Sequence, residues 1–211
     1  QICSWGSLYY AFPLIAAEIE AETGWSRTSL YGAATAGLLL AALAAVPVGR
    51  AIDRGHGRLI MSGASILAGL LLLAWTQVSD LVGFYAIVAL LGALQAATLY
   101  EPAFAVIARR YGAGQARRPI TTLTLWGGFA STVFIPLVQA AIAAWGWRGA
   151  AVMLAGVSIF VCAVIHAAVI RPERDAQPES AAEKPANGKS HLRNAMASPV
   201  FWLIALSFTA H

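Results

Sequence analysis

The chain has 211 residues, of which 59% are hydrophobic and only 11% are charged, and its formal net charge is +4. Because a soluble domain carries about 25% charged residues, this composition excludes an ordinary water-soluble globule. The positive charge does not indicate a nucleic-acid partner, since the basic residues gather in short segments between long apolar runs.

Six apolar stretches predict an all-α membrane protein, because about 20 apolar residues suffice to cross a bilayer as a helix. The predicted helices cover residues 2–17, 28–49, 59–77, 81–108, 119–144 and 149–170. Both ends of the sequence, Gln1 and His211, stand inside apolar runs. We therefore expect the chain to be part of a longer protein, with a further helix starting at Pro199, where Ser198-Pro199 is a typical helix start.

Small residues recur every fourth position in the second predicted helix: Ala33, Gly37, Ala41, Ala45 and Gly49. This spacing places them along one stripe, where another helix can approach closely. At the start of this helix, Ser26 is expected to act as the N-cap. At its end, Gly49 is expected to let the helix lie close to its neighbour.

The loops between the helices predict the orientation in the membrane. All but two of the 14 lysines and arginines lie in the segments 50–58, 109–118 and 171–198. The segments on the other side, 18–27 and 145–148, hold only Arg27 and Arg148, together with tryptophans that are expected to anchor at the membrane interface: Trp25, Trp145 and Trp147. The positive-inside rule then places the three basic segments in the cytoplasm.

The first basic segment, residues 49–58, has a residue pattern that is more specific than its positive charge alone. Read as a charge cluster alone, it is a solvated loop that obeys the positive-inside rule. Its Gly-x-x-x-Asp-Arg run, followed by glycine and arginine, resembles the loop between helices 2 and 3 of the major facilitator superfamily of transporters. The matching residues are Gly49, Asp53, Arg54 and Arg58, while His56 stands between Gly55 and Gly57 where the family has its second glycine.

Further along, the resemblance narrows to the monocarboxylate-porter-like branch of this superfamily. It rests on residues 24–27 (GWSR), 100–104 (YEPAF), 127–132 (GGFAST) and 146–148 (GWR). The resemblance implies twelve helices in two bundles. Residues 1–170 would be the N-terminal six-helix bundle, 171–198 a cytoplasmic linker and 199–211 the start of helix 7. It also implies that helices 1 and 4 line the cavity, that helices 2 and 5 meet the C-terminal six-helix bundle, and that the substrates are small carboxylates, often moved with a proton.

Three polar residues, Gln95, Thr98 and Glu101, recur at spacings of three along the fourth predicted helix. A polar stripe in a membrane helix usually faces the bundle interior or a water-filled cavity, and its alternative role is hydrogen bonding between helices. Because helix 4 is a cavity helix in the resembled fold, we expect the stripe to face the cavity. The first helix adds aromatic candidates whose rings can equally serve packing: Trp5, Tyr9 and Tyr10.

Glu101 is the only acidic residue within an apolar run. It lies eight residues before Arg109, so about 12 Å along a helix at about 1.5 Å per residue. A carboxylate at such a depth is costly unless it is paired or protonated. Pro102 lacks the N–H that would bond the carbonyl of Thr98, which predicts a bend. Either Glu101 carries or gates a coupled proton, or it forms a permanent ion pair, or a hydrogen bond that only stabilises the bend.

No catalytic constellation and no metal or cofactor motif is apparent in the sequence. The four histidines are scattered, and His166 is expected to be a packed residue rather than a proton carrier. The two cysteines, Cys3 and Cys162, lack any motif spacing. We expect a secondary active transporter of a small organic anion in the inner membrane, working by alternating access, with Asp53, Arg54 and Arg58 holding one conformation. The alternatives are a membrane-embedded enzyme and a non-transporting sensor.

Overall fold

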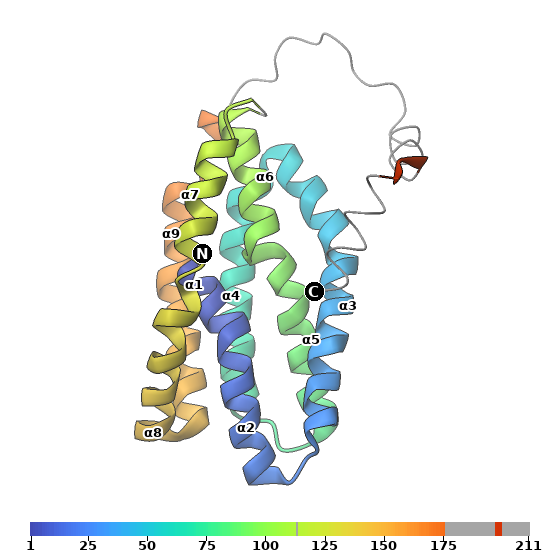
Figure 1. Ribbon diagram of the computed structural model, residues 1–211, viewed down its shortest axis with the longest axis vertical. Helices are drawn as coiled ribbons and strands as arrows, with labels where there is room; N and C mark the ends of the chain where they lie inside the picture. Colours follow the sequence, from blue (N-terminus) through green and yellow to red (C-terminus); the bar gives the residue numbers. More distant parts are fainter. Residues whose placement is uncertain (113, 176–196, 200–211) are drawn as a thin grey trace. The chain divides into compact units, whose positions relative to one another are not determined.

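The computed structural model describes residues 1–112, 114–175 and 197–199. Most of the predicted linker and of the further helix (residues 176–196 and 200–211) lies outside the described residues. The chain divides into two compact units, Gln1–Ala176 and Gln177–His211. The first unit is a bundle of helices, and the described residues contain no strand, which confirms the all-α prediction (Figure 1).

The N-terminal segment is one continuous helical stretch. It comprises α1 (Ile2–Trp5), a π-helical turn η1 (Gly6–Tyr10) and α2 (Ala11–Thr23). It is longer than the predicted 2–17, so the acidic residues Glu18, Glu20 and Glu22 lie on the last turns of α2 rather than in a loop. Gly24, with a φ of 73°, ends the helix in the left-handed conformation that favours glycine.

The next two helices are joined by the first basic segment, residues 49–58, which we also call the charged segment. Helix α3 (Arg27–Ala51) is capped by Ser26, whose Oγ accepts a 3.2 Å hydrogen bond from the Ser29 backbone N–H, as predicted. It continues through η2 (Ile52–His56) into α4 (Gly57–Trp75). The chain departs from helical geometry within η2 at Gly55, whose φ of 91° is readily available only to glycine.

The predicted role of Gly49 as a site of close helix approach is wrong. Helix α3 runs past it to Ala51, and a Cβ atom built on Gly49 would meet no other atom within 4 Å. The close approach occurs nearer the N-terminus of the same stripe, at Gly37. A Cβ atom on Gly92 of α5 would lie 2.3 Å from the Cα of Gly37, so these two helices touch through their backbones.

The fourth predicted helix is broken in two, as α5 (Leu81–Thr98) and α6 (Tyr100–Tyr111). Leu99, with a φ of −87° and a ψ of −145°, separates them. The break lies one turn before Pro102, which supplies no N–H for the carbonyl of Thr98. The side-chain amide of Gln1 donates to that carbonyl instead, over 3.3 Å.

The last part of the unit comprises α7 (Arg117–Gly127), α8 (Ala130–Gly156), η3 (Val157–Cys162), α9 (Ala163–Val169) and η4 (Pro172–Arg174). Within α8, Gly146 leaves the helical conformation with a φ of 69° and a ψ of 175°. This position agrees with the predicted turn at 145–148. Trp147 just after it packs inside the bundle and is only 6% exposed, so the prediction that its ring anchors at the membrane interface is wrong. Its indole N–H donates to the exposed Glu22 carboxylate.

Among the residues that the structure describes, three helical stretches are long and apolar enough to cross a membrane: Arg27–Trp75, Leu81–Tyr111 and Arg117–Val169. Many of their large apolar side chains point away from the bundle. Leu43 is 73% exposed, Val82 80% and Phe160 74%. Such a surface suits lipid or a second helical bundle rather than water. The structure and composition together are those of a multi-pass membrane protein.

The buried core ties the N-terminal helices to those that follow. Ile15 of α2, Leu30 of α3, Phe84 of α5 and Leu154 of α8 are each at most 1% exposed and belong to one cluster. Helix α3 lies along α5, and α4 packs against α8 and α9 (Figure 1). These contacts fix the walls of the cavity described next.

Candidate functional site

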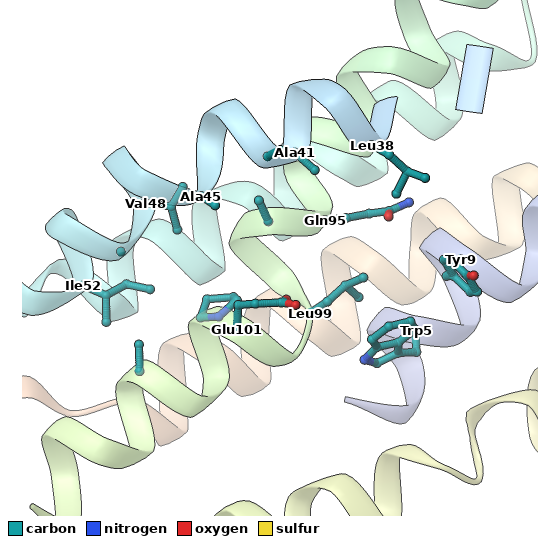
Figure 2. Close-up of a pocket in the computed structure, with 15 residues that line it drawn as sticks. Trp5, Tyr9, Leu38, Ala41, Ala45, Val48, Ile52, Gln95, Leu99 and Glu101 are labelled. Carbon is teal, nitrogen blue, oxygen red and sulfur yellow. The ribbon is translucent and has the colours of Figure 1, made fainter. Parts of the chain in front are cut away.

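A cavity of about 310 Å³ lies between the N-terminal segment, α3, and the α5–α6 break. Glu101, Pro102 and Leu99 line it at the break. Figure 2 shows how its walls are placed, with Trp5 and Tyr9 from the N-terminal segment, Gln95, Leu99 and Glu101 from α5–α6, and Leu38, Ala41, Ala45 and Val48 from α3. We call this space the Glu101 lobe.

The predicted polar stripe of Gln95, Thr98 and Glu101 is divided by the break at Leu99. Gln95 and Glu101 line the Glu101 lobe. Thr98 does not: it is fully buried, and its hydroxyl donates to the Leu94 carbonyl over 2.9 Å. The spacing of three assumed a regular helix, and the irregular residue between Thr98 and Glu101 changes the direction in which the next turn faces.

The two polar residues of the Glu101 lobe differ in how they are held. The amide nitrogen of Gln95 donates to the Leu8 carbonyl over 3.0 Å, which ties α5 to the N-terminal segment. Glu101 is exposed and forms no hydrogen bond or ion pair within the described part of the chain. Its carboxyl group is therefore available to a solute.

Aromatic side chains from the N-terminal segment form the wall facing Glu101. The rings of Trp5 and Tyr9 lie 5.2 Å apart, and the Trp5 ring lies 4.8 Å from that of Tyr100. Tyr10 packs on Tyr9, with centroids 5.4 Å apart, and does not line the lobe. The indole N–H of Trp5 is buried and has no acceptor among the described residues.

The contribution of α3 to the cavity was not predicted. The resemblance assigns helix 2 to the contact with the second bundle, yet Ala41, Ala45 and Gly49 line the Glu101 lobe. Only the first two members of the small-residue stripe, Ala33 and Gly37, are buried. Side chains this small leave room either for a helix or for a solute. The stripe of small residues is therefore the sequence pattern from which a contribution of α3 to the cavity could have been considered.

A second space of about 270 Å³ adjoins the first and shares Tyr9, Leu38 and Gln95 with it. We call it the aromatic lobe because four of its lining residues are aromatic: Tyr9, Phe12, Tyr31 and Trp75. Among the described residues that line the two lobes, Glu101 is the sole Asp, Glu, Lys, Arg or His. Glu101 is therefore the main source of charge in the described lining of the cavity.

The charged segment lies at one end of the bundle and is held by Arg109. The Arg109 guanidinium donates to the backbone carbonyl of Asp53, and its Nε pairs with Asp175 over 2.5 Å. In the described part of the chain, the Asp53 carboxylate and the guanidinium groups of Arg54 and Arg58 form no hydrogen bond or ion pair. The segment is thus joined to the end of α6 and to residue 175, but not through the charges that the pattern emphasises.

At the opposite end, Glu22 joins three separated segments. Its Oε2 accepts from Trp147 Nε1 over 2.6 Å and from Arg148 Nη1 over 2.8 Å, and Arg148 Nε donates to the Thr76 carbonyl over 3.2 Å. The hydrogen bond from Arg148 and then that from Trp147 lower the pKa of Glu22. The ends of α2 and α4 are thereby tied to the turn at Gly146.

The remaining candidate residues are used in packing. His166 is 9% exposed, and its Nδ1 lies 3.0 Å from Ser65 Oγ, in agreement with the predicted packed role. Cys162 Sγ lies 3.6 Å from Ser4 Oγ. Within the described ranges, no three His, Cys, Asp or Glu side chains are grouped so that they could hold a metal ion.

Comparison with known proteins identifies the family. Neither the curated proteins nor the solved structures contain a match to this chain. The sequence model of the family described as Major Facilitator Superfamily matches all of residues 1–211. The apolar helices and the composition agree with a membrane protein of this kind. The chain therefore belongs to the major facilitator superfamily, a family of secondary transporters.

Proposed function

We propose that this chain is the N-terminal six-helix bundle, with the linker and the start of helix 7, of a transporter that moves a small organic anion together with a proton by alternating access. The solute class is that of a monocarboxylate, as the sequence resemblance implies. A C-terminal six-helix bundle of the same full-length protein would complete the cavity. The observation that carries the proposal is the position of Glu101 in a cavity whose described lining holds no basic side chain.

The helix count rests on two glycines. Gly55 interrupts the apolar stretch Arg27–Trp75, and Gly146 interrupts Arg117–Val169. Each of these stretches is far longer than the roughly 20 residues that one crossing needs. Two crossings from each, one from Leu81–Tyr111 and one from residues 2–17 make the proposed bundle of residues 1–170.

The charge of the cavity supports the proposed proton coupling. A carboxylate solute placed beside an ionised Glu101 would be repelled in a medium of low dielectric constant, with no basic side chain from the described lining to offset it. A protonated Glu101 is neutral and can donate a hydrogen bond to the solute. Solute and proton would then bind together, because each favours the form of the site that the other needs.

Glu101→Gln in the full-length protein tests this coupling, because glutamine imitates the protonated carboxyl group. In proteoliposomes, we expect the variant to bind carboxylates and exchange them across the membrane, and to lose accumulation driven by a proton gradient. The matched control is Glu18→Gln, which removes an exposed acid of α2 outside both lobes. If Glu101→Gln still concentrates solute with the wild-type dependence on pH, Glu101 is structural and the proton route lies elsewhere.

The same lining also favours an organic cation, since a carboxylate and the faces of Trp5 and Tyr9 both attract positive charge. The pH dependence of solute binding separates the two solute classes. An anion that binds with a proton is bound more tightly as pH falls, whereas a cation that needs ionised Glu101 is bound more tightly as pH rises. Uptake into sealed vesicles separates a transporter from the alternatives of a sensor and a membrane-embedded enzyme.

A further inference from the structure

The aromatic lobe is a second compartment of the solute cavity with a chemistry of its own. Its lining comes from α2, α3, α4 and α5 as well as from η1. It meets the Glu101 lobe at Tyr9, Leu38 and Gln95, which line both spaces. A solute whose polar end lies beside Glu101 could therefore extend past these three residues into the aromatic lobe.

The rings of the aromatic lobe are arranged as a continuous apolar wall. Phe12 stacks on Trp75 with centroids 6.2 Å apart and planes inclined by 15°. The rings of Phe12 and Tyr31 form a T-shaped pair with centroids 5.6 Å apart. Aliphatic neighbours complete the wall, among them Leu72 and Leu91, which are at most 6% exposed. Such a surface binds aromatic or branched hydrocarbon groups.

Most polar atoms of the lobe are already satisfied by the protein. Ser7 Oγ donates to the Cys3 carbonyl over 2.6 Å, and Thr35 Oγ1 donates to the Tyr31 carbonyl over 3.0 Å. The amide nitrogen of Gln95 is held by Leu8. Trp75 differs: it is 97% buried, and its indole N–H has no acceptor among the described residues. The lobe thus offers apolar surface and no charged group from its described lining.

We propose that the aromatic lobe holds an aromatic or branched apolar body of the transported carboxylate, while the carboxylate end lies in the Glu101 lobe. This inference rests on the proposed transport of organic anions and adds the substrate class. An acid of two or three carbon atoms would fill only part of the Glu101 lobe and would leave the aromatic lobe without an occupant. A larger apolar body would displace water from this surface, which favours binding.

Two alanines of α3 provide a matched pair of variants. Ala34 lines the aromatic lobe and Ala42 lines the Glu101 lobe. Ala34→Leu and Ala42→Leu therefore place the same side chain, from the same helix, in different compartments of the cavity. Leucine is a good helix former, so neither change should disturb α3 itself. Thr35→Leu, at an exposed position of the aromatic lobe, replaces Ala34→Leu if that half-buried site does not accept the larger side chain.

The measurement uses the full-length protein and four probes: acetate, lactate, benzoate and phenylacetate. The affinity of each acid is measured by ligand-induced thermal stabilisation and by how strongly that acid competes with the other probes for proton-driven uptake. We expect the wild type to bind the two aryl acids more tightly than the two short acids. Ala34→Leu should weaken aryl-acid binding by about tenfold or more and leave the short acids within about twofold, since pocket contacts of this size discriminate by about 10–200-fold. Ala42→Leu should weaken all four.

Two results would overturn the inference in distinguishable ways. If short acids are taken up with protons but aryl acids have no advantage, or if Ala34→Leu weakens both kinds equally, the aromatic lobe is not part of the solute site while the transport proposal stands. If none of the four acids binds the wild type or competes for uptake, the proposed anion transport fails and the substrate class fails with it.

Discussion

Glu22 is a single residue on which three segments depend. Its carboxylate receives hydrogen bonds from Trp147 and Arg148, and Arg148 also binds the Thr76 carbonyl. The Arg148 guanidinium lies 4.3 Å from the centre of the Trp147 ring, which adds a cation–π contact. The donors lower the pKa of Glu22, so its ionised form is favoured in the folded protein. The contact is therefore expected to stabilise the bundle in a pH-dependent way.

We predict that Glu22→Gln lowers the unfolding temperature of the purified full-length protein at pH 7. A carboxylate whose folded pKa is depressed contributes stability above its unfolded pKa of about 4.3 and loses that contribution as pH falls through the folded value. The difference between variant and wild type should therefore shrink below about pH 4. Glu18→Gln, on the same helix and without a hydrogen bond or ion pair to any described residue, should unfold like the wild type at both pH values. A difference that persists unchanged into acid would show that the charge of Glu22 is not what matters.

At the scale of elements, the sequence predicts turns better than it predicts faces. Gly55 and Gly146 lie in predicted turns and have the positive φ angles that make glycine necessary there. Pro102 predicted a bend, and the helix breaks at Leu99. The face of α3 was not predictable, because a stripe of small side chains suits a neighbouring helix and a solute cavity equally. The free indole N–H of Trp5 also depends on distant neighbours that no local pattern reports.

We propose that the first basic segment, residues 49–58, acts as a conformational latch through Asp53 and Arg54 of η2 and Arg58 at the start of α4. Arg109 fixes its backbone through the Asp53 carbonyl and pairs with Asp175. The Asp53 carboxylate is in no described ion pair, so it can interact with a partner that changes between conformations. A latch shifts a conformational equilibrium only through contacts that differ between the states.

We predict that Asp53→Asn lowers the transport rate and shifts the balance between inward-open and outward-open states, while solute affinity within one state changes little. Spin-label distances across the two ends of the full-length protein measure the balance. Asp80→Asn at the opposite end is the control, because asparagine caps a helix as well as the aspartate that now accepts from the Gly83 N–H at 2.9 Å. An unchanged distribution of distances in Asp53→Asn would defeat the latch.

For the whole molecule, the ion pairs support the orientation that the distribution of basic residues predicts. The two basic residues outside the three basic segments, Arg27 and Arg148, are each paired with an acid, Glu20 at 3.2 Å and Glu22 at 2.8 Å. At the other end, contacts of Arg109 and Arg110 bring residues 53, 171 and 175 to the end of α6. The excess positive charge of the described residues is thus confined to one end, which we propose faces the cytoplasm from the inner membrane.

Cysteine labelling of intact cells tests this orientation. In a background with Cys3 and Cys162 replaced by serine, Ser79→Cys and Gln115→Cys place single thiols at exposed positions near opposite ends of the α5–α6 pair. We expect a membrane-impermeant maleimide to label position 79 in intact cells and position 115 only after permeabilisation, because lysine- and arginine-rich loops are retained on the cytoplasmic side. Labelling of both positions after permeabilisation confirms that each thiol is reactive. The reverse pattern in intact cells would invert the bundle, and the proton gradient would then reach Glu101 from the opposite end.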